Sequence, residues 1–161
     1  MENKKIILDP CCGGKMFWFN KENPHVIYGD IREVELQLCD GRKLEVAPDL
    51  VMDFRDIPFP DGSFKVVIFD PPHLLDAGES GWLAKRYGSL KKGWEPMIRD
   101  GFSECMRVLE DYGVLIFKWN ETDIPVSRII EVIGHEPLVG NKSGKQARTH
   151  WMCFIKLPEE I

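Results

Sequence analysis

A carboxylate, two prolines and an imidazole follow one another in Asp70-Pro71-Pro72-His73. They come directly after Lys65–Phe69, an apolar run of strand length, so we expect them at the end of a buried strand. Proline has a fixed φ and no backbone N–H, so this segment presents carbonyl oxygens and one carboxylate as hydrogen-bond acceptors. Such a set of acceptors is suited to holding an NH₂ group by its hydrogens.

A second strand-like run, Lys5–Asp9, leads into a turn of small residues. Such a turn lets the backbone approach a ligand closely, so we expect a binding loop made of Pro10, Cys11, Cys12, Gly13 and Gly14. Asp9 can take a cationic amino group at the end of the strand. Asp30 ends the next strand-like run, His25–Tyr28 followed by Gly29, where a carboxylate can accept the hydroxyls of a ribose.

A third segment, Asp53–Phe64, has the order Asp-Phe-Arg-Asp-Ile-Pro-Phe-Pro-Asp-Gly-Ser-Phe. Together, the three segments resemble the motifs of class I S-adenosylmethionine-dependent methyltransferases, in particular those that methylate exocyclic amino groups of bases. The likeness extends from Ile6 to Lys156. It implies S-adenosylmethionine as cofactor, with Asp53 bound to the adenine amine of the cofactor and Phe54 against its adenine ring. It also implies that the catalytic residues are Asp70, Pro71, Pro72 and His73.

The sequence departs from the family pattern at two positions. Lys15 stands where Asp-Pro-x-x-Gly-x-Gly has its last glycine, and His73 stands where the family has Tyr, Phe or Trp. The family aromatic stacks on a base taken out of its helix, and imidazole offers a smaller face for this contact. His73 is therefore consistent with weaker base binding, a different amine substrate, or recognition by hydrogen bonding.

The composition indicates one globular domain, residues 1–161, because 161 residues with 43% apolar content can bury a core of their own. We therefore expect no separate target-recognition domain. No apolar run or signal peptide predicts a membrane location. Five cysteines without Cys-x-x-Cys spacing favour reduced thiols in the cytoplasm and no metal site. Specificity would come from the 74–92 and terminal loops, from a specificity subunit, or from a homodimer.

The net charge of −5 argues against broad binding to duplex nucleic acid by charge alone. Basic residues are nevertheless concentrated in two loops that this fold would place around the substrate opening. We expect them to form a nucleic-acid rim consisting of Lys85, Arg86, Lys91, Lys92, Lys142, Lys145 and Arg148.

Strand-like runs alternate with helical segments, which predicts an α/β fold with a mostly parallel sheet. The resemblance implies a Rossmann-like fold of about seven strands, with a terminal antiparallel strand pair and helices on both faces. Further strands are expected over Leu50–Asp53, Val114–Trp119, Glu136–Val139 and His150–Lys156. Helices are expected to begin over Met16–Asn20 and to span Trp94–Leu109 and Pro125–Ile133.

The connection between the second and third strands has an unusual pattern. Glu33–Leu38 and Lys43–Val46 each alternate between apolar and polar residues, and Asp40-Gly41 lies between them. This pattern predicts a β-hairpin where the family normally has a helix.

The sequence thus predicts methyl transfer from S-adenosylmethionine to an exocyclic amino group, with adenine in DNA as the leading substrate. RNA and the amide of a protein glutamine fit the same acceptor geometry and stay open. So does a degenerate methyltransferase fold that binds without catalysing, because of Lys15 and His73.

Overall fold

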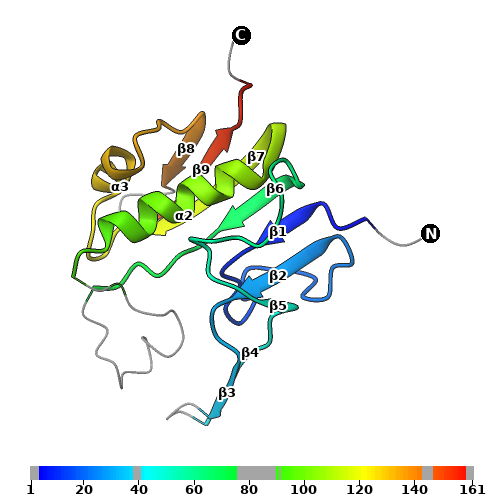
Figure 1. Cartoon of the computed structure of the whole chain (residues 1–161). Coiled ribbons are helices and arrows are strands. Elements are labelled where there is room, and N and C mark those ends of the chain that lie inside the picture. Colours follow the sequence, from blue (N-terminus) through cyan, green and yellow to red (C-terminus); the bar gives the residue numbers. More distant parts are fainter. Residues whose placement is uncertain (1–3, 38–40, 76–89, 91, 143–146, 159–161) are drawn as a thin grey trace.

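The computed structural model of the protein describes residues 4–37, 41–75, 90, 92–142 and 147–158 (Figure 1). Seven strands form one sheet in the order β5-β2-β1-β6-β7-β9-β8. These are β1 (Ile7–Asp9), β2 (Val26–Asp30), β5 (Leu50–Val51), β6 (Phe64–Phe69), β7 (Leu109–Asn120), β8 (Val139–Lys142) and β9 (Thr149–Ile155).

The strands from β5 to β7 run parallel, and β9 runs antiparallel to both of its neighbours. This confirms the predicted fold class with its terminal antiparallel pair. The chain proceeds outward from β1 to β2 and β5 on one side, and from β6 to β7 on the other. The connections therefore change direction between β1 and β6, which is where open α/β sheets form a crevice for ligands.

The predicted hairpin is confirmed. Strands β3 (Val34–Gln37) and β4 (Lys43–Val46) pair antiparallel in a separate small sheet, which extends away from the main sheet beyond β5 (Figure 1). Leu44 and Val46 are buried and pack with Val34, whereas the residues that alternate with them are exposed. This alternation gives the hairpin a small apolar core of its own.

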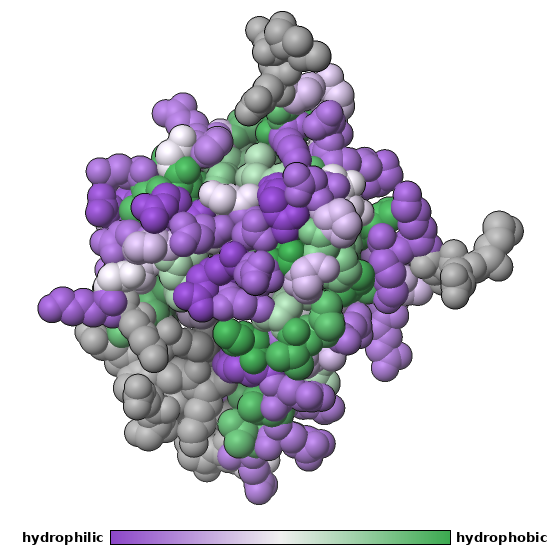
Figure 2. All heavy atoms as spheres, viewed as in Figure 1, coloured by the Kyte–Doolittle hydropathy of each residue, from purple (hydrophilic) through white to green (hydrophobic). Residues whose placement is uncertain are grey.

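Two helices are described, α2 (Glu95–Val108) and α3 (Val126–Ile133), and α2 crosses the face of β6 and β7 (Figure 1). Helix α3 starts after Pro125 and ends at Gly134, whose φ of 71° allows its N–H to cap the carbonyl of Ile130. The outer side of this face is largely hydrophilic (Figure 2).

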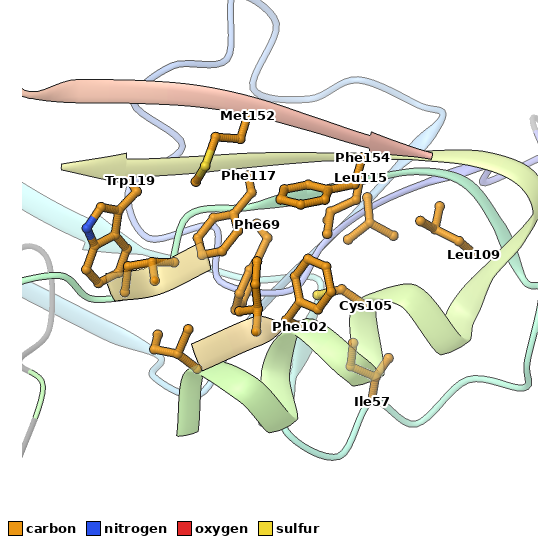
Figure 3. Packing of buried hydrophobic residues seen from close by; sticks show 14 of the residues in the cluster. Ile57, Phe69, Phe102, Cys105, Leu109, Leu115, Phe117, Trp119, Met152 and Phe154 are labelled. Carbon is orange, nitrogen blue, oxygen red and sulfur yellow. The ribbon is translucent and has the colours of Figure 1, made fainter. Parts of the chain in front are cut away.

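The main core lies between these helices and the sheet (Figure 3). In β7, Leu115, Phe117 and Trp119 are fully buried toward the helices. The ring of Phe102 on α2 contacts the rings of Phe117 and Phe154 at centroid distances of 6.4 and 5.1 Å. The residues that alternate with the buried ones in β7 point to the opposite face, where Lys118 becomes important for the site.

The prediction of a helix beginning over Met16–Asn20 is wrong, because this segment consists of turns and bends. Asn20 and Asn23 accept the backbone N–H groups of Glu22 and His25, and such side-chain bonds compete with helical ones. In the described part of the chain, both helices pack on one face of the sheet, whereas helices were expected on both faces (Figure 3).

The strand predicted over Glu136–Val139 begins later, since β8 covers Val139–Lys142. Pro137 lacks an N–H and is disfavoured within a strand. No helix among the described residues is long and apolar enough to cross a membrane. The described cysteines Cys11, Cys12, Cys105 and Cys153 are free thiols.

Candidate active site

A pocket of about 250 Å³ lies at the carboxyl edge of the sheet, where β1 and β6 are adjacent. It brings together parts of the predicted binding loop and of the predicted catalytic segment. Its lining residues are Cys11, Cys12, Gly13, Gly14, Met16, Phe17, Arg32, Asp70, Pro71, His73 and Lys118. Sequence elements that are about 60 residues apart therefore form one site, as the crevice of a doubly wound sheet requires.

A backbone hydrogen bond joins the loop after β1 to the neighbouring strand β2. Pro10 is buried, and the N–H of Cys12 donates to the carbonyl of Gly29 at 2.8 Å. Gly13 has a φ of 49°, and a side chain built on it would contact nothing within 4 Å. The α-carbon of Gly13 thus faces open space at the pocket, where a ligand can approach the backbone closely.

Lys15, which stands where the family pattern has a glycine, has a left-handed backbone conformation with a φ of 53°. Its N–H donates to the carbonyl of Cys12 at 2.8 Å, which closes the turn. Its ammonium lies 4.1 Å from the ring centroid of Tyr28. Lys15 therefore closes the turn in a left-handed conformation, which is costly for a residue with a side chain.

Asp9 is fully buried at the end of β1. Its Oδ2 accepts the indole N–H of Trp18 at 2.8 Å, and its Oδ1 accepts the N–H of Cys11 at 3.3 Å. Burial is the main reason why the pKa of Asp9 is raised to about 7, and the nearby Asp70 raises it further. Asp9 holds the loop and the Trp18 turn together; its expected contact with a cationic amino group stays a prediction.

Asp30 is almost completely buried at the end of β2. Its Oδ2 accepts the N–H of Gly13 at 2.9 Å, and its Oδ1 accepts the N–H and the Nε–H of Arg32 at 2.9 and 3.1 Å. The carboxylate predicted to meet a ribose thus supports the glycine loop and pairs with a cation of the pocket wall. A diol at this position would have to share Oδ1 with Arg32 or displace it.

Asp53 and Phe54 do not line this pocket. The Nε–H of Arg55 donates to both oxygens of Asp53, at 2.9 and 3.0 Å, and these bonds hold the pKa of Asp53 below its usual range. The ring of Phe54 packs edge-on against Phe69 at a centroid distance of 5.3 Å. The contacts of both residues with adenine stay predictions, and Phe54 has a clear packing role.

Asp70 lies at the pocket with about a fifth of its side chain exposed, and it forms an ion pair with Lys118 of β7. The Nζ of Lys118 donates to Oδ2 of Asp70 at 2.7 Å. Burial raises the pKa of Asp70, whereas the charge and the hydrogen bond of Lys118 oppose this rise.

The residues after Asp70 continue the pocket wall. Pro71 is buried and Pro72 is half-buried, and both lack an N–H. The half-buried ring of His73 lies 6.2 Å from that of Trp119, at a steep angle. Burial lowers the pKa of His73, which favours the neutral imidazole. Trp119 is itself a core residue that donates its indole N–H to the carbonyl of Ile124 at 2.9 Å.

Most of the predicted basic rim lies outside the described residues. This applies to Lys85, Arg86, Lys91 and Lys145, and to the side chain of Lys142. Lys92 is exposed in the turn before α2, and Arg148 is exposed just before β9. Leu74, next to the catalytic segment, and Leu90, just before Lys92, are joined, because Leu90 donates its N–H to the carbonyl of Leu74 at 2.8 Å. The convergence of the basic residues stays a prediction.

Sequence reasoning missed the roles of Lys118 and Arg32 in the pocket wall and the exposure of Ile31 beside Asp30. Lys118 is the charged residue within the otherwise apolar run Val114–Trp119, and this interruption of the pattern is a usable signal. Ile31 directly follows Asp30 and is 60% exposed, which is unusual for an isoleucine at the end of a buried strand. It offers an apolar surface beside the carboxylate.

Similar proteins were found by structure only. No family model matches the chain, and no curated protein matches it in sequence. The PH0226 protein from Pyrococcus horikoshii OT3 superimposes with a TM-score of 0.59 at 17% identity, covering 97% of this chain and 84% of that one. A protein from Methanosarcina mazei, described as a SAM-dependent methyltransferase, superimposes with a TM-score of 0.56 at 10% identity, covering 99% and 95%. The chain therefore has the fold of a class I S-adenosylmethionine-dependent methyltransferase.

Proposed function

We propose that this protein binds S-adenosylmethionine in the pocket between the loop after β1 and Asp70, and methylates an amino group there. The observation that carries the proposal is the meeting of Gly13, Asp70 and Pro71 in one pocket at the crevice of the sheet. The free space at the α-carbon of Gly13 and the carboxylates of Asp30 and Asp70 fit a ligand that has hydroxyl groups and positive charge.

The residues that would hold the cofactor are Gly13 and Gly14 through their backbone, Asp30 at its hydroxyl groups and Ile31 at an apolar ring. When bound, S-adenosylmethionine supplies a methyl group on a positively charged sulfur. The rest of the molecule is a good leaving group, because it departs as a neutral thioether. The protein then needs chiefly to position the accepting nitrogen.

Positioning would be the task of Asp70 and the proline segment. An ionised Asp70 accepts one hydrogen of the substrate amino group, and a backbone carbonyl of Asp70-Pro71-Pro72 accepts the other. The nitrogen lone pair is thereby turned toward the methyl carbon. With S-adenosylmethionine bound, this orientation would allow in-line attack on the methyl carbon, and the Asp70 carboxylate would accept the proton that the methylated nitrogen then loses.

The leading substrate is the exocyclic amino group of adenine in DNA. The order of the motifs and the Asp-Pro-Pro sequence support this proposal, and the basic residues predicted around the opening would bind the phosphate backbone. His73 would contact the base. RNA and a glutamine amide are the alternatives with the same acceptor geometry, and a specificity subunit or a homodimer would extend the small domain.

The test is a binding and transfer experiment with the full chain. Isothermal titration measures the affinity for S-adenosylmethionine, and transfer of labelled methyl is followed with duplex DNA, single-stranded DNA, structured RNA and mixed protein. Label in a nucleic acid supports the proposal. Binding without transfer to any substrate would instead favour the degenerate binding module, and failure to bind S-adenosylmethionine would refute both.

A further inference from the structure

We infer that Lys118 is a positioning residue that anchors one oxygen of Asp70 and makes the site select an uncharged amino group over an ammonium. This inference rests on the proposed function, because it names the chemical class of the accepting nitrogen at the same site. An aromatic amine and a carboxamide belong to the selected class; a lysine ε-ammonium belongs to the rejected one.

The geometry leaves one carboxylate oxygen for the substrate. Lys118 donates to Oδ2 of Asp70 at 2.7 Å, and both side chains are about four-fifths buried. Among the described residues, no hydrogen bond to Oδ1 of Asp70 is formed. The anchored carboxylate thus keeps a fixed orientation and presents Oδ1 as the acceptor for a substrate N–H.

Lys118 is itself held from the side opposite the helices. Its Nζ lies 5.5 Å from the ring centroid of Phe17 and 5.8 Å from that of Trp151, its cross-strand neighbour on β9. Aromatic faces attract an ammonium at such distances. The ion pair therefore has a defined position, unlike an exposed pair whose long side chains are free to move.

Several charged or titratable groups surround Asp70. Lys118 comes from β7, His73 follows Asp70 in the chain, and Asp9 and Cys11 come from the end of β1. Arg32 lines the same pocket but is paired with Asp30. Because burial raises the pKa of Asp70, loss of Lys118 would leave its protonated form more populated near neutral pH. A protonated carboxyl has a donor where the substrate N–H needs an acceptor.

The ammonium group of Lys118 also explains the expected selectivity. A neutral amino group at Oδ1 adds no charge, whereas an ammonium would place a second positive charge beside Lys118. Replacing Lys118 with methionine removes this repulsion and keeps a long, unbranched side chain beside the rings of Phe17 and Trp151. An ammonium must lose a proton before its nitrogen can attack, and the Asp70 carboxylate would take that proton. Lys118→Met should therefore gain relative activity toward ammonium substrates as it loses activity toward neutral amines.

The experiment compares Lys118→Met and Lys118→Arg with the matched control Lys65→Met. Lys65 also forms a lysine–carboxylate pair, at 2.6 Å with Glu110, but that pair is exposed and far from the pocket edge. The titration of the Asp70 carboxyl carbon is followed by NMR and assigned with Asp70→Asn. Methyl transfer to DNA and to a lysine peptide is measured across pH, and thermal unfolding checks that each variant is folded.

We expect Lys118→Met to raise the titration midpoint of Asp70 by at least about one pH unit. The acid limb of the rate profile should shift by the same amount, and the preference for DNA over the lysine peptide should fall at least about tenfold. Lys118→Arg should restore the midpoint, and Lys65→Met should change nothing. An unchanged Asp70 midpoint in folded Lys118→Met overturns the inference whether or not transfer is detected. If the wild type transfers methyl to nothing, the proposed function and the selectivity fail, although the carboxyl titration still reports the anchoring.

Discussion

Gly13 donates its backbone N–H to Oδ2 of Asp30 across 2.9 Å, which ties the glycine loop to the end of the neighbouring strand β2. The same carboxylate pairs with Arg32 through Oδ1. The two strand ends that would bind the cofactor are therefore linked before any ligand arrives. Loss of this link should affect binding more than a structural bond elsewhere would.

Asp30→Asn tests this link. The neutral amide keeps one acceptor oxygen but loses the charge-assisted bonds, so we expect the affinity for S-adenosylmethionine to fall at least about tenfold, with about 1–3 kcal/mol lost from the free energy of unfolding. Asp49→Asn is the matched control, because Asp49 accepts the N–H of Tyr28 at 3.1 Å outside the pocket lining. An equal loss of affinity in both variants would contradict the account.

Lys15 offers a test of the left-handed turn. Both Lys15→Gly and Lys15→Val remove the ammonium from the ring of Tyr28, but only glycine adopts a φ of 53° without strain. Lys15→Gly should bind S-adenosylmethionine as the wild type does, and Lys15→Val should be less stable than Lys15→Gly by about 1–3 kcal/mol. Urea unfolding and calorimetric titration measure the two effects. Equal stability of the two variants would mean that the turn does not need this conformation.

The raised pKa of Asp9 predicts that the stability of the fold depends on pH. This pKa is raised to about 7 in the folded protein, well above its unfolded value. The protonated form is thus favoured by folding, and the stability associated with it is present at low pH and lost as the pH rises toward 7. Asp9→Asn stays neutral, so it should gain stability relative to the wild type on going from pH 4 to pH 8, by an amount on the order of 4 kcal/mol. Urea unfolding across this range measures the difference, and a constant difference would refute the raised pKa.

Much of the architecture was predictable because the strands carry local signals. Val66–Phe69 is apolar throughout, and Asp40-Gly41 separates two alternating runs, so the central strand and the hairpin both follow from short-range patterns. The Met16–Asn20 segment shows the limit of such signals. Its apolar residues suit a helix, but Trp18 reaches Asp9 and two asparagines cap backbone N–H groups, and these contacts depend on the folded neighbourhood.

The site was predictable to a similar degree. The motifs placed Gly13 and Asp70 at one sheet edge, and the structure brings them into one pocket. The ion-pair partner of Asp70 was not predictable, because Lys118 is 48 residues away in the chain and meets Asp70 only through the pairing of β6 and β7. The direction in which Phe54 points likewise depends on tertiary packing.

Phe54 separates packing from binding. Its ring contacts Phe69, and a side chain on Gly101 of α2 would lie 2.5 Å from it, so the ring fills space between the sheet and the helix. Phe54→Ala should lower the free energy of unfolding by about 2–3 kcal/mol, at the low end for a partly buried ring. We expect the affinity for S-adenosylmethionine, measured well below the melting temperature, to change less than about threefold. A large loss of affinity with unchanged stability would instead support the predicted contact with adenine.

The central claim is that Asp70 positions an amino group for methylation, and labelled methyl transfer by the wild type and Asp70→Ala tests it most directly. Asp111→Ala serves as a control for removal of an exposed carboxylate distant from the pocket. We expect label in a nucleic acid with the wild type and with Asp111→Ala. Asp70→Ala should transfer at least about a hundredfold less, while its affinity for S-adenosylmethionine stays within about threefold. Undiminished transfer by Asp70→Ala would contradict the account.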